Sequence, residues 1–264
     1  MEEIIVSTSN PRIKNVLKLK EKSSERKMQN LIVVEGLREI KMARENKFEI
    51  KTLFVCDAIF QRSNKEILLG VHHLVRVSKE VFDKIAYREN SDGLLALVVS
   101  KYLRFSDLKL SQNPLLVILE SVEKPGNLGA ILRTVDAADV DAVIVCDPRT
   151  DIYNPNVIRS SIGCIFSTQT ISASSDEVFQ FLQQKKIKSY SASPSSKKLY
   201  TETDLKIPCA IVFGTEAEGL SSKWLNSSDE QIKIPMLGKV DSLNVSASCA
   251  IILYEAIRQR AIQK

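Results

Sequence analysis

The segment that decides the fold is Ile234-Pro-Met-Leu-Gly-Lys-Val-Asp-Ser-Leu-Asn-Val-Ser-Ala-Ser-Cys-Ala-Ile-Ile-Leu-Tyr-Glu-Ala-Ile-Arg-Gln-Arg260. A short polar loop, residues 238–244, leads directly into an apolar run that predicts a helix over residues 245–258. Two further unusual loops lie upstream in the chain. This combination is typical of an enzyme domain that binds a ligand.

The composition is that of an ordinary globular protein. With 264 residues, 44% of them hydrophobic, the chain can form one large or two modest domains with a real core. The N-terminus lacks a basic region followed by a long apolar run, and no apolar stretch approaches membrane-spanning length. We therefore expect a cytoplasmic protein without a membrane partner.

The five cysteines indicate buried thiols. They are odd in number, widely scattered and mostly set among apolar residues, and the two histidines are the adjacent pair His72-His73. No metal-ligand spacing is present, so the sequence predicts neither a zinc site nor another metal site.

The basic excess lies in the N-terminal part of the chain. Residues 1–110 hold 21 Lys and Arg against 15 Asp and Glu, while the remainder holds 16 against 17. A polar segment there predicts a surface that contacts phosphates, through Lys14, Lys18, Lys20, Arg26 and Lys27. The alternative on composition alone is a solvated helix face whose charge is softened by nearby glutamates.

Alternating elements run through both halves of the chain. Before residue 100, we expect strands at 31–34, 52–55, 74–77 and 94–99, with helices at 13–19, 37–46, 66–71 and 81–86, which form a small α/β domain. Residues 101–113 are mixed and polar and are predicted to be a linker. From residue 114 to 264, apolar strands at 115–119, 142–146 and 210–213 alternate with helices at 128–138, 176–184 and 245–258. This pattern predicts a parallel sheet covered on both faces.

The loop after the first strand of the second half carries chemistry. Glycines and Asn127 stand at the start of a helix, where free backbone N–H groups can hold an anion. The three glycines of a dinucleotide-binding fingerprint are not present. Arg133 follows inside an apolar helix start, where it must reach either an anion or a structural acid such as Glu120.

Two later loops offer polar groups beside apolar side chains. In Phe213-Gly-Thr-Glu-Ala-Glu-Gly219, glycines permit close backbone approach to a ligand, and a carboxylate stands near whatever binds. In the third loop, Ser242 and Asn244 lie near apolar residues, a mixture suited to a purine with its ribose. Either polar residue would also serve as the N-cap of the C-terminal helix, and both roles are compatible.

These three segments resemble the SpoU family of knotted RNA 2′-O-ribose methyltransferases. The resemblance covers residues 114–260 through Asn127-Leu-Gly-Ala-Ile-Leu-Arg-Thr, Gly214-Thr-Glu-Ala-Glu-Gly-Leu and Ile234-Pro-Met with Ser242-Leu-Asn-Val-Ser. Residues 154–163 look like the intervening segment of the family. Residues 1–100 are similar, more loosely, to the RNA substrate-binding domain of its longer members.

The resemblance implies an α/β fold whose C-terminal part forms a deep trefoil knot, against the near absence of knots in proteins. The knot would form the pocket for S-adenosylmethionine and the protein would be a homodimer. Carried over by position, the residues lining this pocket are Gly214, Glu216, Gly219, Ile234, Met236, Leu243 and Asn244. The catalytic set carried over in the same way is Asn127, Arg133, Glu216, Ser242 and Asn244.

Arg133 matches the arginine that the family is regarded as using in catalysis. An arginine is a reluctant general base because its pKa exceeds about 12. We therefore expect it to stabilise the developing 2′-oxyanion or an adjacent phosphate. One departure from the family is Asp139 or Val140 where a glycine is common, and Asp is the better tolerated in a left-handed conformation.

The predicted reaction is 2′-O-methylation of RNA. Structured ribosomal RNA of the 23S type is the expected substrate, since an additional N-terminal domain with a basic segment suits recognition by shape and phosphate contacts. Transfer RNA is the near alternative. An RNA-binding protein that has lost catalysis is the alternative from another class, and the retained polar residues disfavour it.

Overall fold

The computed structural model describes residues 4–71, 73–87 and 91–261, and its chain divides into two compact units. The first unit comprises residues 1–101 together with 153–167, and the second comprises residues 102–152 and 168–264. The sequence predicts that residues 153–167 belong to the second domain, whereas in the structure they pack with the first unit. Among the described residues, no helix is both long and apolar enough to cross a membrane.

The first unit is built on a five-stranded mixed sheet in the order β1-β4-β3-β5-β2. Its strand β5 runs antiparallel to β2 and β3, while β1, β3 and β4 are parallel neighbours. The strands are β1 (Ile4–Ile5), β2 (Leu31–Glu35), β3 (Ile50–Val55), β4 (Leu74–Val77) and β5 (Leu94–Val99). The helices are α1 (Pro11–Glu21), α2 (Ser23–Gln29), α3 (Leu37–Glu45), α4 (Lys79–Ile85), α6 (Pro155–Ser160) and α7 (Cys164–Ser167), with a 3-10 helix at Arg62–Leu68.

Both faces of this sheet are covered by helices. Apolar residues of α1 and α4 pack on one face in a single core cluster, α3 packs against β2 and β5, and α6 lies along the edge strand β2, where Pro155 and Ile158 share a small pocket with Val33. The inserted segment is held tightly: the rings of Phe48 and Phe166 meet edge to face at 4.9 Å, and a Cβ added to Gly163 would lie 2.9 Å from the Cβ of Met42. Residues 153–167 therefore pack against β2 and α3 of the first unit.

The second unit is built on a seven-stranded parallel sheet in the order β10-β12-β9-β11-β6-β7-β8. This confirms the predicted parallel sheet. The strands are β6 (Leu115–Glu120), β7 (Ala142–Cys146), β8 (Thr170–Ala173), β9 (Lys188–Ala192), β10 (Lys198–Leu199), β11 (Cys209–Phe213) and β12 (Glu230–Lys233). The helices are α5 (Pro125–Ala137), α8 (Ser175–Lys185), α9 (Ser222–Ser227) and α10 (Val245–Ala261), with 3-10 helices at Phe105–Asp107 and Tyr200–Glu202.

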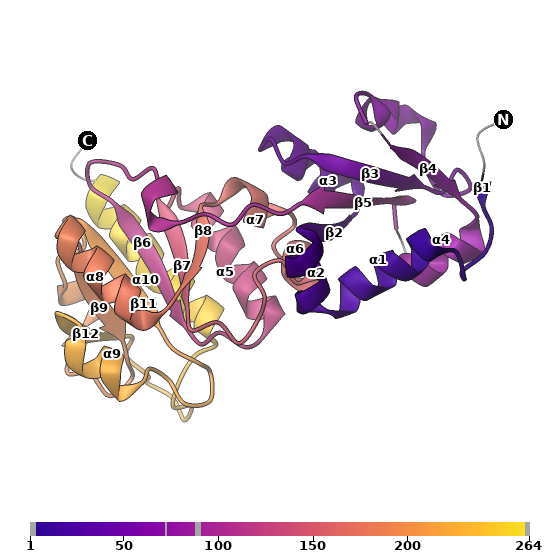
Figure 1. Cartoon of the computed structure of the whole chain (residues 1–264). Coiled ribbons are helices and arrows are strands. Elements are labelled where there is room, and N and C mark those ends of the chain that lie inside the picture. Colours follow the sequence, from indigo (N-terminus) through magenta and orange to yellow (C-terminus); the bar gives the residue numbers. More distant parts are fainter. Residues whose placement is uncertain (1–3, 72, 88–90, 262–264) are drawn as a thin grey trace. The chain divides into compact units, whose positions relative to one another are not determined.

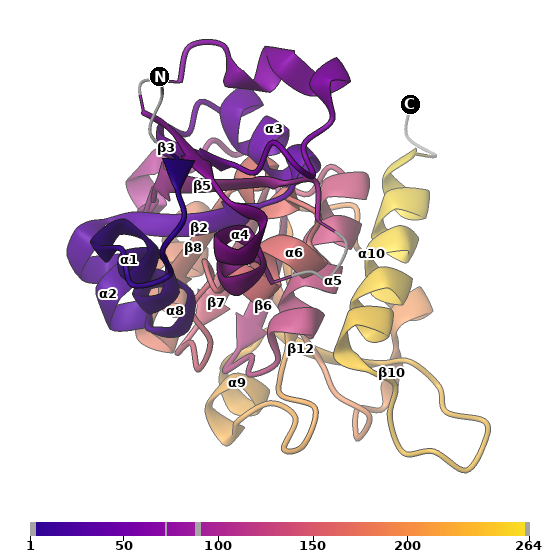
Figure 2. The ribbon, with the colours of Figure 1, turned by 90° about the vertical axis from the view of Figure 1, so that its right-hand side faces the viewer.

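Helices cover this sheet on two sides. Apolar side chains of α8 and α9 join the strands in one core cluster, while α10, a single uninterrupted helix in Figure 2, packs against α5 and β11. The prediction that the cysteines are buried thiols is confirmed, because all five are buried and free. Burial raises the pKa of the Cys249 thiol, which keeps it protonated and inert.

Helix ends follow the sequence signals. Ser174 and Glu177 form a capping box at α8, and Asn244 caps α10 by accepting the backbone N–H of Ser246 at 2.9 Å. Asp139 follows α5 with a positive φ of 50°, as expected for the position where the family often has glycine.

Candidate active site

The site is formed where the three unusual loops meet in the second unit. Glu216, in the loop after β11, accepts a hydrogen bond from Asn127 of α5 at 2.7 Å and one from Asn244, which precedes α10, at 2.5 Å. The amide of Asn244 also donates to Asn127 at 3.2 Å. One carboxylate therefore joins residues that are 89 and 28 positions away from it in the chain.

Lys124 completes this cluster. Its ammonium group forms an ion pair with the second carboxylate oxygen of Glu216. That hydrogen bond, helped by the one from Asn127, holds the pKa of Glu216 below its usual range. Glu216 is therefore ionised at neutral pH with its oxygens occupied, which suits a positioning group and makes it a weak proton acceptor. Lys124 gave no signal in the sequence, because a lone lysine before a helix has no distinctive pattern.

A cavity of about 440 Å³ opens beside the cluster. Its volume lies within the range of small-molecule sites, roughly 300–1,000 Å³. Six of the seven residues predicted to bind the cofactor line it, and so does Ser242. Those six are Gly214, Glu216, Gly219, Ile234, Met236 and Leu243. Asn244 lies outside this set, and its amide reaches Glu216 instead.

The two glycines of the second loop are required for different physical reasons. Thr215 and Gly219 exchange backbone hydrogen bonds at 3.0 and 3.1 Å, which fold the loop back on itself. A Cβ at Gly214 would lie 2.1 Å from the carbonyl carbon and oxygen of Gly219, so this position excludes every side chain. Gly219 has a positive φ of 70°, a conformation that L-residues rarely adopt.

A fourth segment of the cavity wall was missed from the sequence. Residues 192–195 line the cavity from the loop between β9 and β10. Their Ser-Pro-Ser composition indicates only a turn, and nothing in the pattern points to a ligand.

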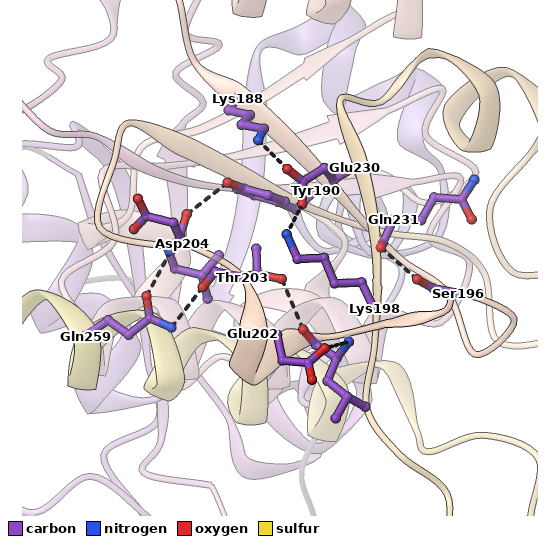
Figure 3. A network of polar contacts seen from close by, with 12 residues as sticks. Lys188, Tyr190, Ser196, Lys198, Glu202, Thr203, Asp204, Glu230, Gln231 and Gln259 are labelled. Atoms are coloured by element: carbon purple, nitrogen blue, oxygen red, sulfur yellow. Dashed lines mark hydrogen bonds and ion pairs between the residues drawn. The ribbon is translucent and has the colours of Figure 1, made fainter.

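This wall is anchored by the network in Figure 3. The hydroxyl of Ser196 donates to the carbonyl of Gln231 at 2.7 Å, and Glu230 of β12 forms ion pairs with Lys188 and Lys198 from β9 and β10. Those lysines lower the pKa of Glu230. On the far side of the network, Gln259 of α10 donates to the carbonyl of Thr203 at 3.0 Å. Ser196 thus ties the loop to β12, while Gln259 ties the segment after β10 to α10.

Arg133 stands apart from the Glu216 cluster. Six residues beyond Asn127, it leaves α5 about 120° further round the axis, and it is absent from the cavity lining. Its side chain is exposed and has no hydrogen bond or ion pair with any residue that the structure describes. The structural pairing with Glu120 is excluded, because that carboxylate is buried and accepts the backbone N–H of Ser221 at 2.8 Å.

The basic segment of the first unit divides into two groups. Lys14, Lys18 and Lys27 are exposed, as a phosphate-contacting surface requires. The prediction for Arg26 is wrong: it is 2% exposed, and its guanidinium donates to the carbonyl of Leu19 at 2.7 Å. It joins α2 to the end of α1 and is not available to RNA.

Lys20 is the second correction in this segment. It is half-buried, and its ammonium group donates to the carbonyls of Ile85 and Ala86 at the end of α4. Burial lowers the pKa of Lys20. Both misassigned residues use long apolar stems to bring a cation to backbone carbonyls, which composition alone cannot distinguish from a surface charge.

Comparison with known proteins decides the family. The model of the SpoU rRNA Methylase family matches residues 114–254, which is more than half of the chain. The chain belongs to this family. This confirms the resemblance seen in the three motifs, and it makes the chain a methyltransferase by family. A second model, the MRM3-like substrate binding domain, matches residues 10–96.

One named relative and two solved structures are similar to most of this chain. The 23S rRNA (guanosine-2′-O-)-methyltransferase RlmB of Vibrio parahaemolyticus is 34% identical over 72% of this chain and 79% of its own length. A crystal structure described as an RNA 2′-O ribose methyltransferase is 38% identical, with a TM-score of 0.87, over 98% of this chain and 100% of that one. The SpoU methyltransferase AviRb of Streptomyces viridochromogenes, solved in complex with AdoMet, is 25% identical, with a TM-score of 0.89, over 96% of this chain and 100% of that one.

Proposed function

We propose that this SpoU methylase transfers a methyl group from S-adenosylmethionine to a ribose 2′-hydroxyl of RNA. Structured ribosomal RNA of the 23S type is the preferred substrate. The observation that carries the proposal is the junction of three motif loops at Glu216, beside a cavity of about 440 Å³. The relatives named above as 2′-O-methyltransferases support both the reaction and the substrate class.

The cavity fits the proposed cofactor. Its apolar lining by Ile234, Met236 and Leu243 suits a purine, and the hydroxyl of Ser242 and the carboxylate of Asp241 suit a ribose or an amino acid group. At Gly214 the backbone is bare because no side chain fits there, which permits close approach. When bound, S-adenosylmethionine supplies an activated methyl group.

The protein residues contribute orientation and electrostatics. We assign Glu216 a positioning role, since it lines the cavity and its occupied oxygens hold Asn127 and Asn244. The Arg133 guanidinium offers five N–H donors, which suits a developing 2′-oxyanion or a neighbouring phosphate. In-line placement of the ribose oxygen against the methyl carbon would supply much of the rate enhancement.

A homodimer is part of the proposal. Large hydrophobic residues are exposed on the loop before α10 and on α10 itself: Leu237 is 97% exposed, Val240 62% and Tyr254 52%. Apolar side chains gathered on one segment are typical of an interface. Sedimentation of the native protein and of Tyr254→Glu tests this, and a monomeric native protein with full turnover would contradict it.

A deep trefoil knot in the cytoplasmic enzyme completes the proposal. The match of residues 114–254 to the SpoU family model supports it, because the knot is what the resemblance to this family implies. Stretching the unfolded chain by its two ends tests it. A knot tightens under force and leaves the extended chain shorter than its residue count requires.

The test of the reaction is transfer of labelled methyl from S-adenosylmethionine to unmodified ribosomal and transfer RNA fractions, with identification of the nucleoside formed. A 2′-O-methylated nucleoside from the ribosomal fraction, absent with Arg133→Ala, is the expected result. Labelling of transfer RNA alone would move the substrate to that class. Binding of RNA without any labelling by the native protein would indicate an inactive member of the fold.

A further inference from the structure

The first unit contains a cavity of about 390 Å³ that is separate from the methyltransferase site. It is lined by residues from the first turns of α1 and from strands β3, β4 and β5. The lining residues are Arg12, Asn15, Thr52, Phe54, His73, Leu74, Val75 and Leu97. This volume again falls within the range of small-molecule sites, roughly 300–1,000 Å³.

The floor of this cavity is apolar and rigid. Phe54, Val75 and Leu97 come from three adjacent strands, and their exposed fractions are 1%, 6% and 7%. They belong to the main core cluster of the unit. The packing of the core therefore fixes the floor in place.

The rim of the cavity is polar and cationic. Arg12 and His73 are exposed, and the guanidinium of Arg12 has no hydrogen bond or ion pair within the described parts of the chain. The side chains of Asn15 and Gln29 exchange two hydrogen bonds of 2.9 Å. That exchange holds the Asn15 amide in place and leaves one of its N–H groups and part of its carbonyl for a ligand.

An apolar floor, a fixed amide and a free guanidinium match the parts of one nucleotide. A base can lie on the floor, with its edge read by the amide, and its phosphate can face the guanidinium. We propose that this cavity binds one unpaired nucleotide of the RNA substrate, with Arg12 at the phosphate and Asn15 at the base edge. The inference rests on the proposed function, since it takes RNA to be the substrate.

The outer side of α1 favours a strand over a free nucleotide. Lys14 and Lys18 are exposed there, about 160° and 120° around the helix axis from Arg12, so a strand that leaves the cavity across α1 meets further cations. Single-stranded RNA offers an unstacked base, whereas a base within a duplex cannot enter.

The test uses the full chain and a short fluorescein-labelled oligoadenylate, with an RNA duplex of equal length beside it. Binding is followed by fluorescence anisotropy over a range of salt concentrations. The variants are Arg12→Ala, His73→Ala and Thr52→Phe, and the control is Arg38→Ala, which removes an exposed arginine of α3 outside the cavity. Thr52→Phe fills the cavity without changing the charge.

We expect Arg12→Ala to weaken oligoadenylate binding and to lower the slope of log Kd against log salt by about 0.7, the value for one phosphate of a single strand. Thr52→Phe should weaken binding about tenfold with an unchanged slope, because a stacked base is lost and no phosphate contact is. Arg38→Ala should stay within about twofold of the native protein.

Two results would overturn the inference while leaving methyl transfer intact. One is native affinity in both Arg12→Ala and Thr52→Phe. The other is weakening by Arg12→Ala alone, which would reduce the cavity to a surface charge. If Thr52→Phe has a lower melting temperature than the native protein, His73→Ala, an exposed change at the rim, takes its place. Its oligoadenylate affinity is then compared with that of the native protein in the same way. Failure of the native protein both to bind RNA and to methylate it would instead refute the proposed function.

Discussion

Replacing Gly214 by alanine should destroy the cofactor pocket while leaving the protein folded. The new Cβ would lie 2.1 Å from the Gly219 carbonyl and 2.4 Å from the backbone nitrogen of Leu220. Ordinary contact begins near 3.4 Å, so the loop must move by more than 1 Å. That movement breaks the two backbone hydrogen bonds between Thr215 and Gly219.

The size of the effect follows from those two bonds. At about 0.5–1.5 kcal/mol each, their loss costs about 1–3 kcal/mol of loop stability. If the whole cost falls on binding, the affinity for S-adenosylmethionine drops by roughly fivefold to 150-fold. The melting temperature should change little, because the loop lies outside the core of the sheet.

Two other glycines provide graded controls. A Cβ at Gly126 meets nothing within 4 Å, so Gly126→Ala should bind the cofactor normally. Gly219→Ala also meets nothing but keeps a positive φ of 70°, which costs about 1–2 kcal/mol, so it should fall between the two. Isothermal titration with S-adenosylmethionine measures all three. Native affinity in Gly214→Ala would refute the reasoning, since the loop would then have to be free of the backbone contact described.

Three further predictions concern single side chains. Glu216 has a lowered pKa, so its stabilising contribution is complete above the ordinary carboxyl pKa of 4.5 and is lost as the pH falls through the lower folded value. Cofactor affinity should therefore be flat near neutral pH and decline below about 4.5, and Glu216→Gln should remove that decline; titrations across this range check it, and an unchanged decline in the variant would point to another group. Arg133→Ala should reduce turnover by about a hundredfold or more with cofactor affinity within twofold, as single-turnover kinetics can measure, and near-normal turnover in Arg133→Lys would argue against a geometric role of the guanidinium. Arg26→Ala should destabilise the protein by about 2–3 kcal/mol in urea unfolding because it leaves buried carbonyls unpaired, whereas Lys27→Ala should change stability by less than about 0.5 kcal/mol; equal effects would contradict the assignment of Arg26 as structural.

The strands that were predictable from the sequence are the apolar ones. Residues 115–120 and 142–146 are buried on both faces of the sheet, so nearly all their side chains are apolar. Such a run of apolar residues is visible in the sequence. Strand β9 was missed because it reads Lys-Ser-Tyr-Ser-Ala, yet its central residues are buried. Ser189 is satisfied by the carboxylate of Asp229 at 2.7 Å, and Ser191 by Ser228. Those partners come from a distant segment, so no local pattern reveals them.

The site was predictable to a similar degree. Motif loops identify the residues that line the cavity, because glycines and polar side chains after apolar strands are local signals. They do not identify Lys124 or the wall at residues 192–195, whose positions depend on tertiary packing. For the cations near residue 20, the sequence gives their charge and not their burial, and burial decides which of them can meet RNA.

The division of the chain bears on how the protein emerges from the ribosome. Residues 1–101 lack α6 and α7, which pack against β2 and α3 of the same unit. During synthesis, these surfaces of β2 and α3 stay uncovered while β6, α5 and β7 are being translated. Its folding can be completed only after residue 167 has left the exit tunnel, by which time part of the second unit has also been made. Folding of the first unit is thus coupled to synthesis of the second. A fragment ending at residue 101 would expose permanently the surface that the nascent chain exposes only briefly.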